Sequence, residues 1–150
     1  MLTGNTRNCG KSGTPAANPP GQTAASGTGS ELVVKIGASA PLTGPQAHIG
    51  KDNENGTRMA IEDANTRGVI IGGKKVHFEL LSEDDQTDPK TATIVAQKLV
   101  DAKVNGIIGH LNSGTTIPAS RIYNDNGIPQ ISPSATAVAI PRRVLKPLFV

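Results

Sequence analysis

The feature that most constrains the fold is a repeated alternation between short apolar runs and longer segments with helical spacing. The apolar runs are rich in β-branched residues and cover residues 32–38, 76–81, 107–109 and 129–132. Segments with three- and four-residue apolar spacing separate them. An order of strand, helix, strand, helix, strand, helix, strand predicts an α/β fold, with three layers and helices on both faces of a parallel sheet.

The pattern within individual segments predicts their burial. Residues 33–38 are apolar at almost every position, which is typical of a strand in the interior of a parallel sheet. In the first helical segment the apolar residues recur at helical spacing and predict its core-facing stripe. They are Ile49, Gly56, Met59, Ala60 and Ala64. Gly68 is the expected end of this helix.

The second and third helices have recognisable starts. Asp88 followed by Pro89 is a strong N-terminal signal, because aspartate caps a helix and proline is tolerated at its first position. The apolar stripe of the second helix is Ala92, Val95, Ala96 and Leu99. In the third helix Pro118 is expected within the first turn, which predicts a start near Thr115 or Thr116. This helix should stop before Gly127.

Composition divides the chain into two parts. Residues 1–30 consist mostly of Gly, Ser, Thr, Ala, Asn and Pro, and they predict a disordered tail or tether. Residues 31–150 form the expected folded domain. The net charge of +3 is scattered and the chain has two Phe, one Tyr and no Trp, so neither a basic stripe nor a base-stacking platform is present. We therefore expect no nucleic-acid partner.

The single cysteine, Cys9, lies in the tail and cannot form an intramolecular disulfide. It is either an incidental free thiol or a lipid attachment site. Cys-Gly followed by a polar tether is typical of the residues after a cleaved lipoprotein signal. The residues before Cys9 argue the other way, because they contain no charged segment followed by an apolar one.

Three loops are predicted to form a ligand site. In parallel α/β sheets ligands bind beyond the carboxyl ends of the strands, which selects residues 40–50, 109–116 and 132–137. Ser113 and Thr115 offer hydroxyl groups beside a helix N-terminus, where an anion such as a carboxylate or a phosphate is favoured. The same residue types are also typical of a plain helix cap.

The third loop adds a complementary set of groups. Ser134, Ala135 and Thr136 supply hydroxyls and carbonyls, and carbonyls can accept from an ammonium group. Donors for a carboxylate and acceptors for an amine together suit a free amino acid.

Several sharper motifs do not fit. Gly109 and Gly114 have the spacing of a phosphate loop, but Thr115 stands where that motif requires lysine. The three histidines lack metal-ligand spacing, so neither a metal nor a cofactor is expected. His110, at the end of a predicted strand, could contact a ligand, but a single histidine there is interpreted as a packed or capping residue. The acidic residues 83–85 are interpreted as a solvated rim and not as a catalytic acid–base pair.

Four separated motifs, in order, resemble the type I periplasmic binding proteins for leucine, isoleucine and valine. They are Ile36-Gly37 with Pro41-Leu42-Thr43-Gly44, Asp84-Asp85 with Asp88-Pro89-Lys90, Ile108-Gly109-His110-Leu111 with Ser113, and Ile131-Ser132-Pro133-Ser134-Ala135-Thr136. The similarity runs from about residue 33 to 140. It implies that residues 31–150 are the N-terminal lobe of a two-lobed, non-enzymatic solute receptor whose second lobe is missing from this sequence.

The resemblance also implies roles for individual residues. Ser113 would donate to the ligand's α-carboxylate, and Thr136 would contact both charged groups. The backbone carbonyl of Ser134 would accept from the ammonium group, with Ala135 and Thr115 nearby and Ile49 lining the site. The expected partners are a free aliphatic amino acid and the permease subunits of an ABC importer. The expected location is the periplasm or extracytoplasmic face, with or without a lipid anchor.

Two departures and two alternatives accompany this interpretation. Some family members have a disulfide between the acidic loop and the position that Asn112 occupies here. The residues from 137 onward match poorly. The alternatives are a ligand-sensing domain of a receptor or regulator with the same fold, and a small α/β enzyme acting on a phosphorylated substrate. The first would require an appended membrane span or DNA-binding motif, and the second a catalytic cluster.

Overall fold

The computed structural model describes residues 31–139. Its elements, in chain order, are β1 (Leu32–Ala40), α1 (Ala47–Arg67), β2 (Ile70–Ile71), β3 (Lys74–Asp84), α2 (Pro89–Asp101), β4 (Gly106–Gly109), α3 (Ser113–Asp125) and β5 (Gln130–Ile131). The predictions for residues 1–30, including the role of Cys9, and for residues 140–150 lie outside the described residues. Within the described range, no helix is long and apolar enough to cross a membrane.

The five strands form one sheet with the order β2-β3-β1-β4-β5. β1 lies between β3 and β4 and runs parallel to both, so that Ile36 is opposite Leu80 on one side and Gly106 on the other. β5 continues the sheet in parallel beyond β4. The predicted parallel sheet with an interior first strand is therefore confirmed. β2 was not predicted, and it is a short antiparallel strand joined to β3 by a turn.

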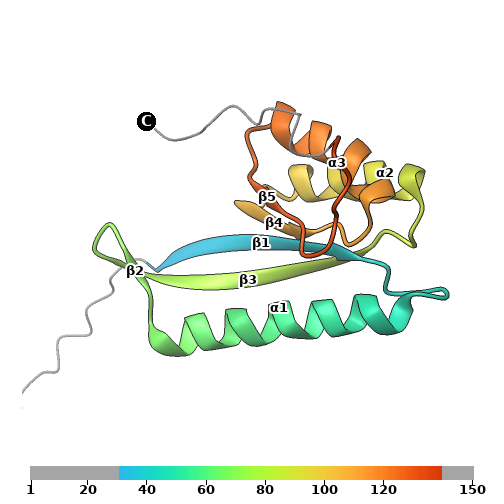
Figure 1. The fold of residues 1–150 in the computed structure, drawn as a ribbon. Helices are drawn as coiled ribbons and strands as arrows, with labels where there is room; N and C mark the ends of the chain where they lie inside the picture. The colour runs from blue at the N-terminus through green and yellow to red at the C-terminus, as the bar shows by residue number, and fades with distance from the viewer. Residues whose placement is uncertain (1–30, 140–150) are drawn as a thin grey trace, which may run out of the picture.

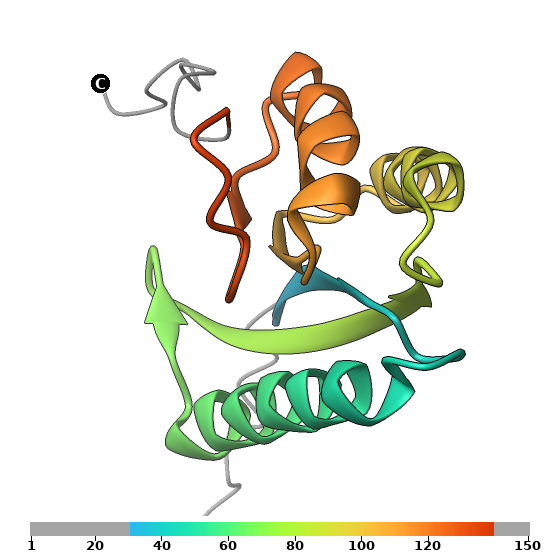
Figure 2. The same ribbon diagram turned by 45° about the vertical axis from the view of Figure 1, so that its right-hand side comes forward.

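Helices cover both faces of the sheet, as the alternation predicted. α1 lies along one face, and α2 and α3 lie side by side over the other (Figures 1 and 2). An apolar core cluster lies between the sheet and the α2/α3 layer. It contains Val95, Ala96, Leu99, Val104, Ile107, Ala119 and Tyr123.

The predicted core stripe of α1 is wrong in its residues, although the helix itself is confirmed. The exposed fractions of Ile49 and Met59 are 47% and 69%. The buried residues of this helix are Gly50 and Thr57. Gly50 approaches the preceding loop so closely that an added Cβ would lie 1.9 Å from the carbonyl oxygen of Pro41. Small residues therefore set the docked face, because only they permit this approach.

The helix α2 agrees with its sequence signals. The Asp88 side chain accepts a hydrogen bond from the backbone N–H of Thr91 (2.7 Å), and Pro89 occupies the first helical position. The hydrogen bonds from the Thr91 N–H and hydroxyl lower the pKa of the Asp88 carboxyl. The predicted stripe of α2 is buried: Ala92, Val95, Ala96 and Leu99.

The start of α3 differs from the prediction. The helix begins at Ser113, so Pro118 lies inside it and not in the first turn. Proline there removes one backbone donor and brings its ring near the carbonyl of Gly114. Gly114 itself is exposed. The helix ends at Asp125, before Gly127, as predicted.

Candidate functional site at the carboxyl edge of the sheet

The loops selected from the sequence meet at one edge of the sheet. β1, β3, β4 and β5 are parallel, so their carboxyl ends point the same way. The segments that follow them, including residues 41–46, 110–112 and 132–137, therefore lie at this edge. This is the position at which α/β sheets place ligands.

The end of β4 fits tightly against β1. Gly109 has φ of +127°, and an added Cβ would lie 2.1 Å from the carbonyl oxygen of Ser39. Only glycine combines this backbone conformation with such a close approach. The next residue, His110, consequently enters the interior, and its side chain is 0% exposed.

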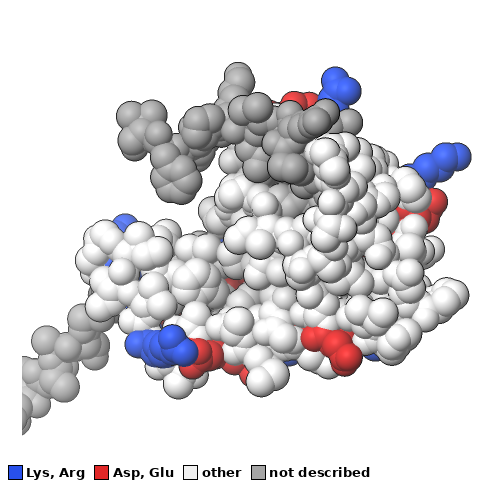
Figure 3. Space-filling model, in the orientation of Figure 1, with Lys and Arg blue, Asp and Glu red and all other residues white. Residues whose placement is uncertain are grey.

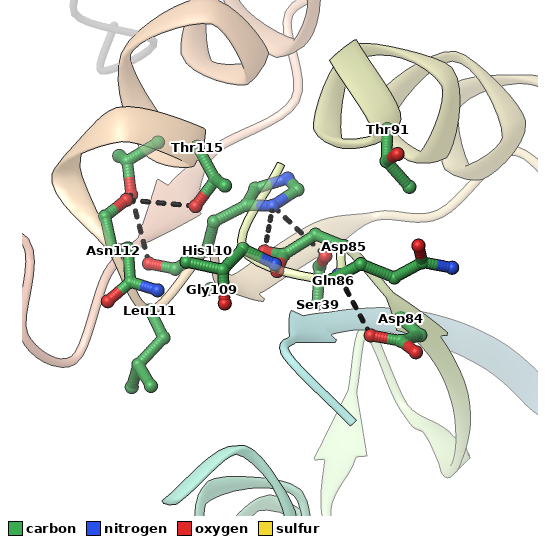
Figure 4. A network of polar contacts seen from close by, with 12 residues as sticks. Ser39, Asp84, Asp85, Gln86, Thr91, Gly109, His110, Leu111, Asn112 and Thr115 are labelled. Atoms are coloured by element: carbon green, nitrogen blue, oxygen red, sulfur yellow. Dashed lines mark hydrogen bonds and ion pairs between the residues drawn. The ribbon is translucent and has the colours of Figure 1, made fainter. Parts of the chain in front are cut away.

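The ring of His110 lies in a buried polar cluster (Figure 4). Its Nδ1 is 2.7 Å from Oδ2 of Asp85 and 3.0 Å from Oγ of Ser39. Its Nε2 is 3.2 Å from the hydroxyl of Tyr123. An ionised Asp85 can only accept, so Nδ1 carries a proton in this arrangement, and Nε2 of a neutral ring accepts from the Tyr123 hydroxyl.

The phenol of Tyr123 is suited to that donor role. Burial, together with the nearby negative charge of Asp85, raises the pKa of Tyr123 well above its ordinary value. The hydroxyl therefore keeps its proton at neutral pH. The interpretation of His110 as a packed residue is confirmed.

The serine, histidine and aspartate of this cluster do not form a nucleophilic triad. In such a triad aspartate orients one ring nitrogen while the other takes the serine proton. Here Ser39 and Asp85 both contact Nδ1. Ser39 is also 1% exposed, so a substrate has no access to its hydroxyl.

The acidic residues 83–85, at the end of β3, are not the solvated rim that the sequence suggested. Asp85 is fully buried against His110. Asp84 accepts from the backbone N–H of Leu42 (2.8 Å), from the hydroxyl of Thr43 and from the N–H of Gln86 (2.9 Å). Glu83 pairs with Lys98 of α2. The three consecutive carboxylates therefore contact three different parts of the fold: helix α2, the loop after β1, and His110 at the end of β4.

The hydrogen bonds to Asp84 also govern its titration. Partial burial raises the pKa of this carboxyl, but the donors on Thr43, Gln86 and Leu42 together hold it below its ordinary value. Asp84 is therefore ionised at neutral pH, and it fixes the loop that leads into α1.

The N-terminus of α3 lies at the centre of this edge. Asn112 is the capping residue, and its carbonyl accepts from the N–H groups of Thr115 (3.2 Å) and Thr116 (2.9 Å). Its side chain donates to Oε1 of Gln46 (2.8 Å), which joins this loop to the one after β1. The N–H groups of Ser113 and Gly114 belong to the first turn, for which a helix supplies no acceptor of its own.

A series of hydrogen bonds that involve side chains docks β5 and the segment after it onto the end of β4 and the start of α3. Gln130 donates to the carbonyl of Gly109 (2.7 Å), and Ser132 donates to the carbonyl of His110 (2.6 Å). Ser134 donates to the carbonyl of Leu111 (2.6 Å). The N–H of Ala137 then donates to Oγ of Ser113 (3.3 Å). Side chains thus continue the pairing of β4 and β5 past the end of the sheet.

The structure brings most of the predicted site residues together. Ser113 is half-buried at the start of α3, and the segment with Ser134, Ala135 and Thr136 is fastened to it. Thr115 differs, because it is fully buried and its hydroxyl donates to the carbonyl of Asn112 (2.9 Å). It serves the helix cap in this structure. Ile49 is exposed in the first turn of α1.

Sequence reasoning missed the roles of Asp84, Asp85 and Ser39. A signal for Asp85 exists in the two-residue period of β3. Side chains alternate between the two faces of a strand, so residues 81 and 85 point to the same face. Leu81 packs against the core cluster, which indicates that the side chain of Asp85 also points inward. Within residues 31–139, no three metal-ligating side chains gather in one place.

Comparisons with known proteins agree with this architecture. The family model described as "Periplasmic binding protein" matches residues 33–143. The chain belongs to the periplasmic binding protein family. This family assignment confirms the resemblance that the four sequence motifs carried.

Three similar proteins represent the family members that the chain matches. The leucine-specific-binding protein of Salmonella typhimurium is 44% identical over 110 residues, which are 73% of this chain and 29% of that protein. The leucine-, isoleucine-, valine-, threonine- and alanine-binding protein of Pseudomonas aeruginosa is 41% identical over 116 residues, 77% and 30% of the two chains. Among solved structures, the chain is similar to LivJ from Streptococcus pneumoniae, a branched-chain amino acid transporter substrate-binding protein in complex with isoleucine. The two structures align with a TM-score of 0.67 and 31% sequence identity, and the alignment covers 73% of this chain and 31% of LivJ.

The chain thus spans about a third of the length of these periplasmic binding proteins, a share that fits one lobe. The predicted fold class, a lobe of the type I periplasmic-binding-protein fold, is confirmed.

Proposed function

We propose that the carboxyl edge of this lobe binds the α-carboxylate and α-ammonium groups of a free aliphatic amino acid. In this proposal the lobe is part of an extracytoplasmic solute receptor that delivers its ligand to the permease subunits of an ABC importer. A second lobe would complete the enclosure. The relatives support the substrate class, since their names and the bound isoleucine concern leucine and related amino acids.

The observation that carries the proposal is the hydrogen bond from the Ala137 N–H to Oγ of Ser113 (3.3 Å). It places the segment with Thr136 directly beside the N-terminus of α3. Because Ser113 accepts this bond, its own hydroxyl proton remains available to donate to a ligand. The groups proposed to bind the carboxylate and those proposed to bind the ammonium group are therefore neighbours, as a zwitterion requires.

The carboxylate end of the ligand is favoured by two independent effects. The Ser113 hydroxyl and the first-turn N–H groups of Ser113 and Gly114 supply donors. The helix dipole adds about 0.3–1 kcal/mol for an anion at an exposed helix N-terminus, and more where water is excluded. On the face shown in Figure 3, the positive and negative side chains are separated and do not form a basic patch. This face therefore gives no indication of a binding site for a long polyanion.

The ammonium end would be held by the segment after β5. The hydroxyl of Ser134 donates to Leu111, which fixes the segment and orients its peptide groups. Thr136 is exposed and offers a hydroxyl oxygen. Ile49, exposed in the first turn of α1, is the aliphatic group available for the ligand's side chain.

Removal of either ligand-contacting hydroxyl tests the proposal. A hydrogen bond to a charged group contributes about 1.5–3 kcal/mol, so Ser113→Ala and Thr136→Ala should each weaken binding of L-leucine roughly ten- to a hundredfold. Calorimetry or an NMR titration of the 150-residue chain with leucine, isoleucine and valine measures this. Ser120→Ala is the matched control, because Ser120 lies in α3 but donates within the helix, to Ile117.

Two results would reject the assignment. Equal affinity in both hydroxyl variants and the unaltered chain would show that these hydroxyls do not contact the ligand. Preference for a phosphate ester over the three amino acids would favour the enzyme alternative. Weak binding by this chain is expected, because a single lobe contacts only one side of a ligand.

A further inference from the structure

His110 lies beneath the proposed ligand-binding segments and is completely buried. Its ring joins three separate parts of the fold. Asp85 comes from the segment after β3, Ser39 from β1 and Tyr123 from α3. Figure 4 shows the ring directed toward Asp85 and Ser39, away from Asn112. No ligand at the sheet edge could contact a ring with this burial.

The backbone of the same residue faces the ligand-binding segment. The carbonyl oxygen of His110 accepts from the hydroxyl of Ser132 (2.6 Å) and from that of Thr116 (3.0 Å). Oγ of Ser132 in turn accepts from the N–H of Ala135 (3.1 Å). The Ser132 hydroxyl therefore links the carbonyl of His110 to the N–H of Ala135, next to Thr136. These two consecutive hydrogen bonds are called the relay below.

We propose that His110 is a positioning residue of the amino-acid site: its buried ring fixes its own peptide, and its carbonyl, through Ser132, sets the position of residues 134–137. This inference rests on the proposed function for its effect on affinity. The mechanical part, from the ring to the Ala135 peptide, is independent of which ligand binds.

The shape of imidazole explains why a histidine suits this task. Its two nitrogens lie on different sides of a rigid ring, so one group can bond Asp85 and Tyr123 at once. Asparagine keeps one donor near the position of Nδ1 but does not reach both partners. Gly109, the residue before the histidine, lies so close to Ser39 that an added Cβ would be 2.1 Å from its carbonyl oxygen, which limits movement of the backbone toward β1.

The first test needs no ligand. Hydrogen exchange of the Ala135 amide, followed by NMR, reports the relay, because its only acceptor among the described contacts is Ser132. His110→Asn and Ser132→Ala should each lower the protection of this amide about tenfold. Val95→Ala is the control, because it removes buried volume from the apolar core but none of the polar groups that bond the His110 ring. Unchanged protection in Ser132→Ala, which alters one half-buried hydroxyl, would overturn the proposal even if His110→Asn fails to fold.

The second test is a leucine titration of the same variants. His110→Asn and Ser132→Ala should each weaken binding about three- to tenfold, and the double variant should be no weaker than the weaker single variant, because both act through one relay. Val95→Ala should leave the affinity unchanged at equal folded fraction. Equal affinity of Ser132→Ala and the unaltered chain would overturn the inference. If the unaltered chain does not bind leucine, the proposed function fails, while the exchange measurement still decides the relay.

Discussion

The two faces of the sheet are held to their helices by different kinds of interaction. The face under α2 and α3 is apolar, and its cluster includes Leu99, Ile107 and Tyr123. On the other face, the buried residues that helix α1 contributes are small or polar, Gly50 and Thr57. Asn65 binds both the N–H (2.8 Å) and the carbonyl (2.9 Å) of Phe78 in β3. Apolar burial is non-directional, whereas a paired hydrogen bond fixes one register.

This difference shows where sequence patterns are informative. An apolar stripe predicts a docked face when apolar burial does the docking, and the stripe of α2 was predicted correctly. In α1 the exposed Met59 and the buried Gly50 and Thr57 reverse the expected pattern. Polar and small residues add little to the hydrophobic periodicity of a helix. A buried face made of such residues therefore cannot be identified from the spacing of apolar residues.

The largest effect is expected on the apolar face. Leu99→Ala should lower the free energy of unfolding by about 2–5 kcal/mol, because it removes a fully buried side chain and leaves a cavity. Met59→Ala, on the exposed side of α1, should change it by less than about 0.5 kcal/mol. Urea unfolding followed by circular dichroism measures both. Similar losses for the two variants would contradict the contrast between the faces.

An intermediate effect on stability is expected from the hydrogen bonds that attach α1 to β3 through Asn65. Asn65→Ala should cost about 1–3 kcal/mol, because two backbone groups of Phe78 lose their partner in a half-buried position. Asn55→Ala, exposed on the same helix, is the control. Hydrogen exchange should also show α1 opening more often while α2 stays protected. Loss of protection in α2 to the same extent would show that the two faces are not independent.

The smallest effect concerns pH. The folded state holds the pKa of Asp84 below its ordinary value, so this carboxylate stabilises the fold fully above the unfolded pKa of 3.8, and that contribution is lost as the pH falls through the lower folded value. Asp84→Asn should remove this part of the acid dependence. Asp52→Asn, exposed on α1, should retain it. Unfolding curves between about pH 2 and pH 6 make the comparison, and identical acid dependence in Asp84→Asn and the unaltered chain would contradict it.

Much of the fold could be predicted from the residues alone, because alternation of β-branched runs with capped helices leaves few topologies. The antiparallel strand β2 was missed because two residues give no periodic signal. The start of α3 was misplaced because Pro118 lies inside the helix and not in its first turn, four residues after the exposed Gly114.

The site was predictable in part for a related reason. The rule that ligands bind beyond the carboxyl ends of parallel strands selects the segments containing Ser113 and Thr136. This rule does not indicate which hydroxyl groups in those segments point toward a ligand and which bond to the protein itself. Thr115 turns back to its own cap, and the consecutive Asp84 and Asp85 serve two different loops. Only the three-dimensional pairing of β1, β3 and β4 separates these roles.

The most direct measurement is a map of backbone amide shifts when L-leucine is added to the 150-residue chain. The proposed site predicts that the largest changes occur at Ser113, Gly114 and Thr136, at the carboxyl edge of the sheet, and that D-leucine or leucinamide, which lacks the carboxylate, produces much smaller ones. Changes centred on the β2–β3 turn at the opposite end, or equal responses to leucine and leucinamide, would contradict the proposed amino-acid site.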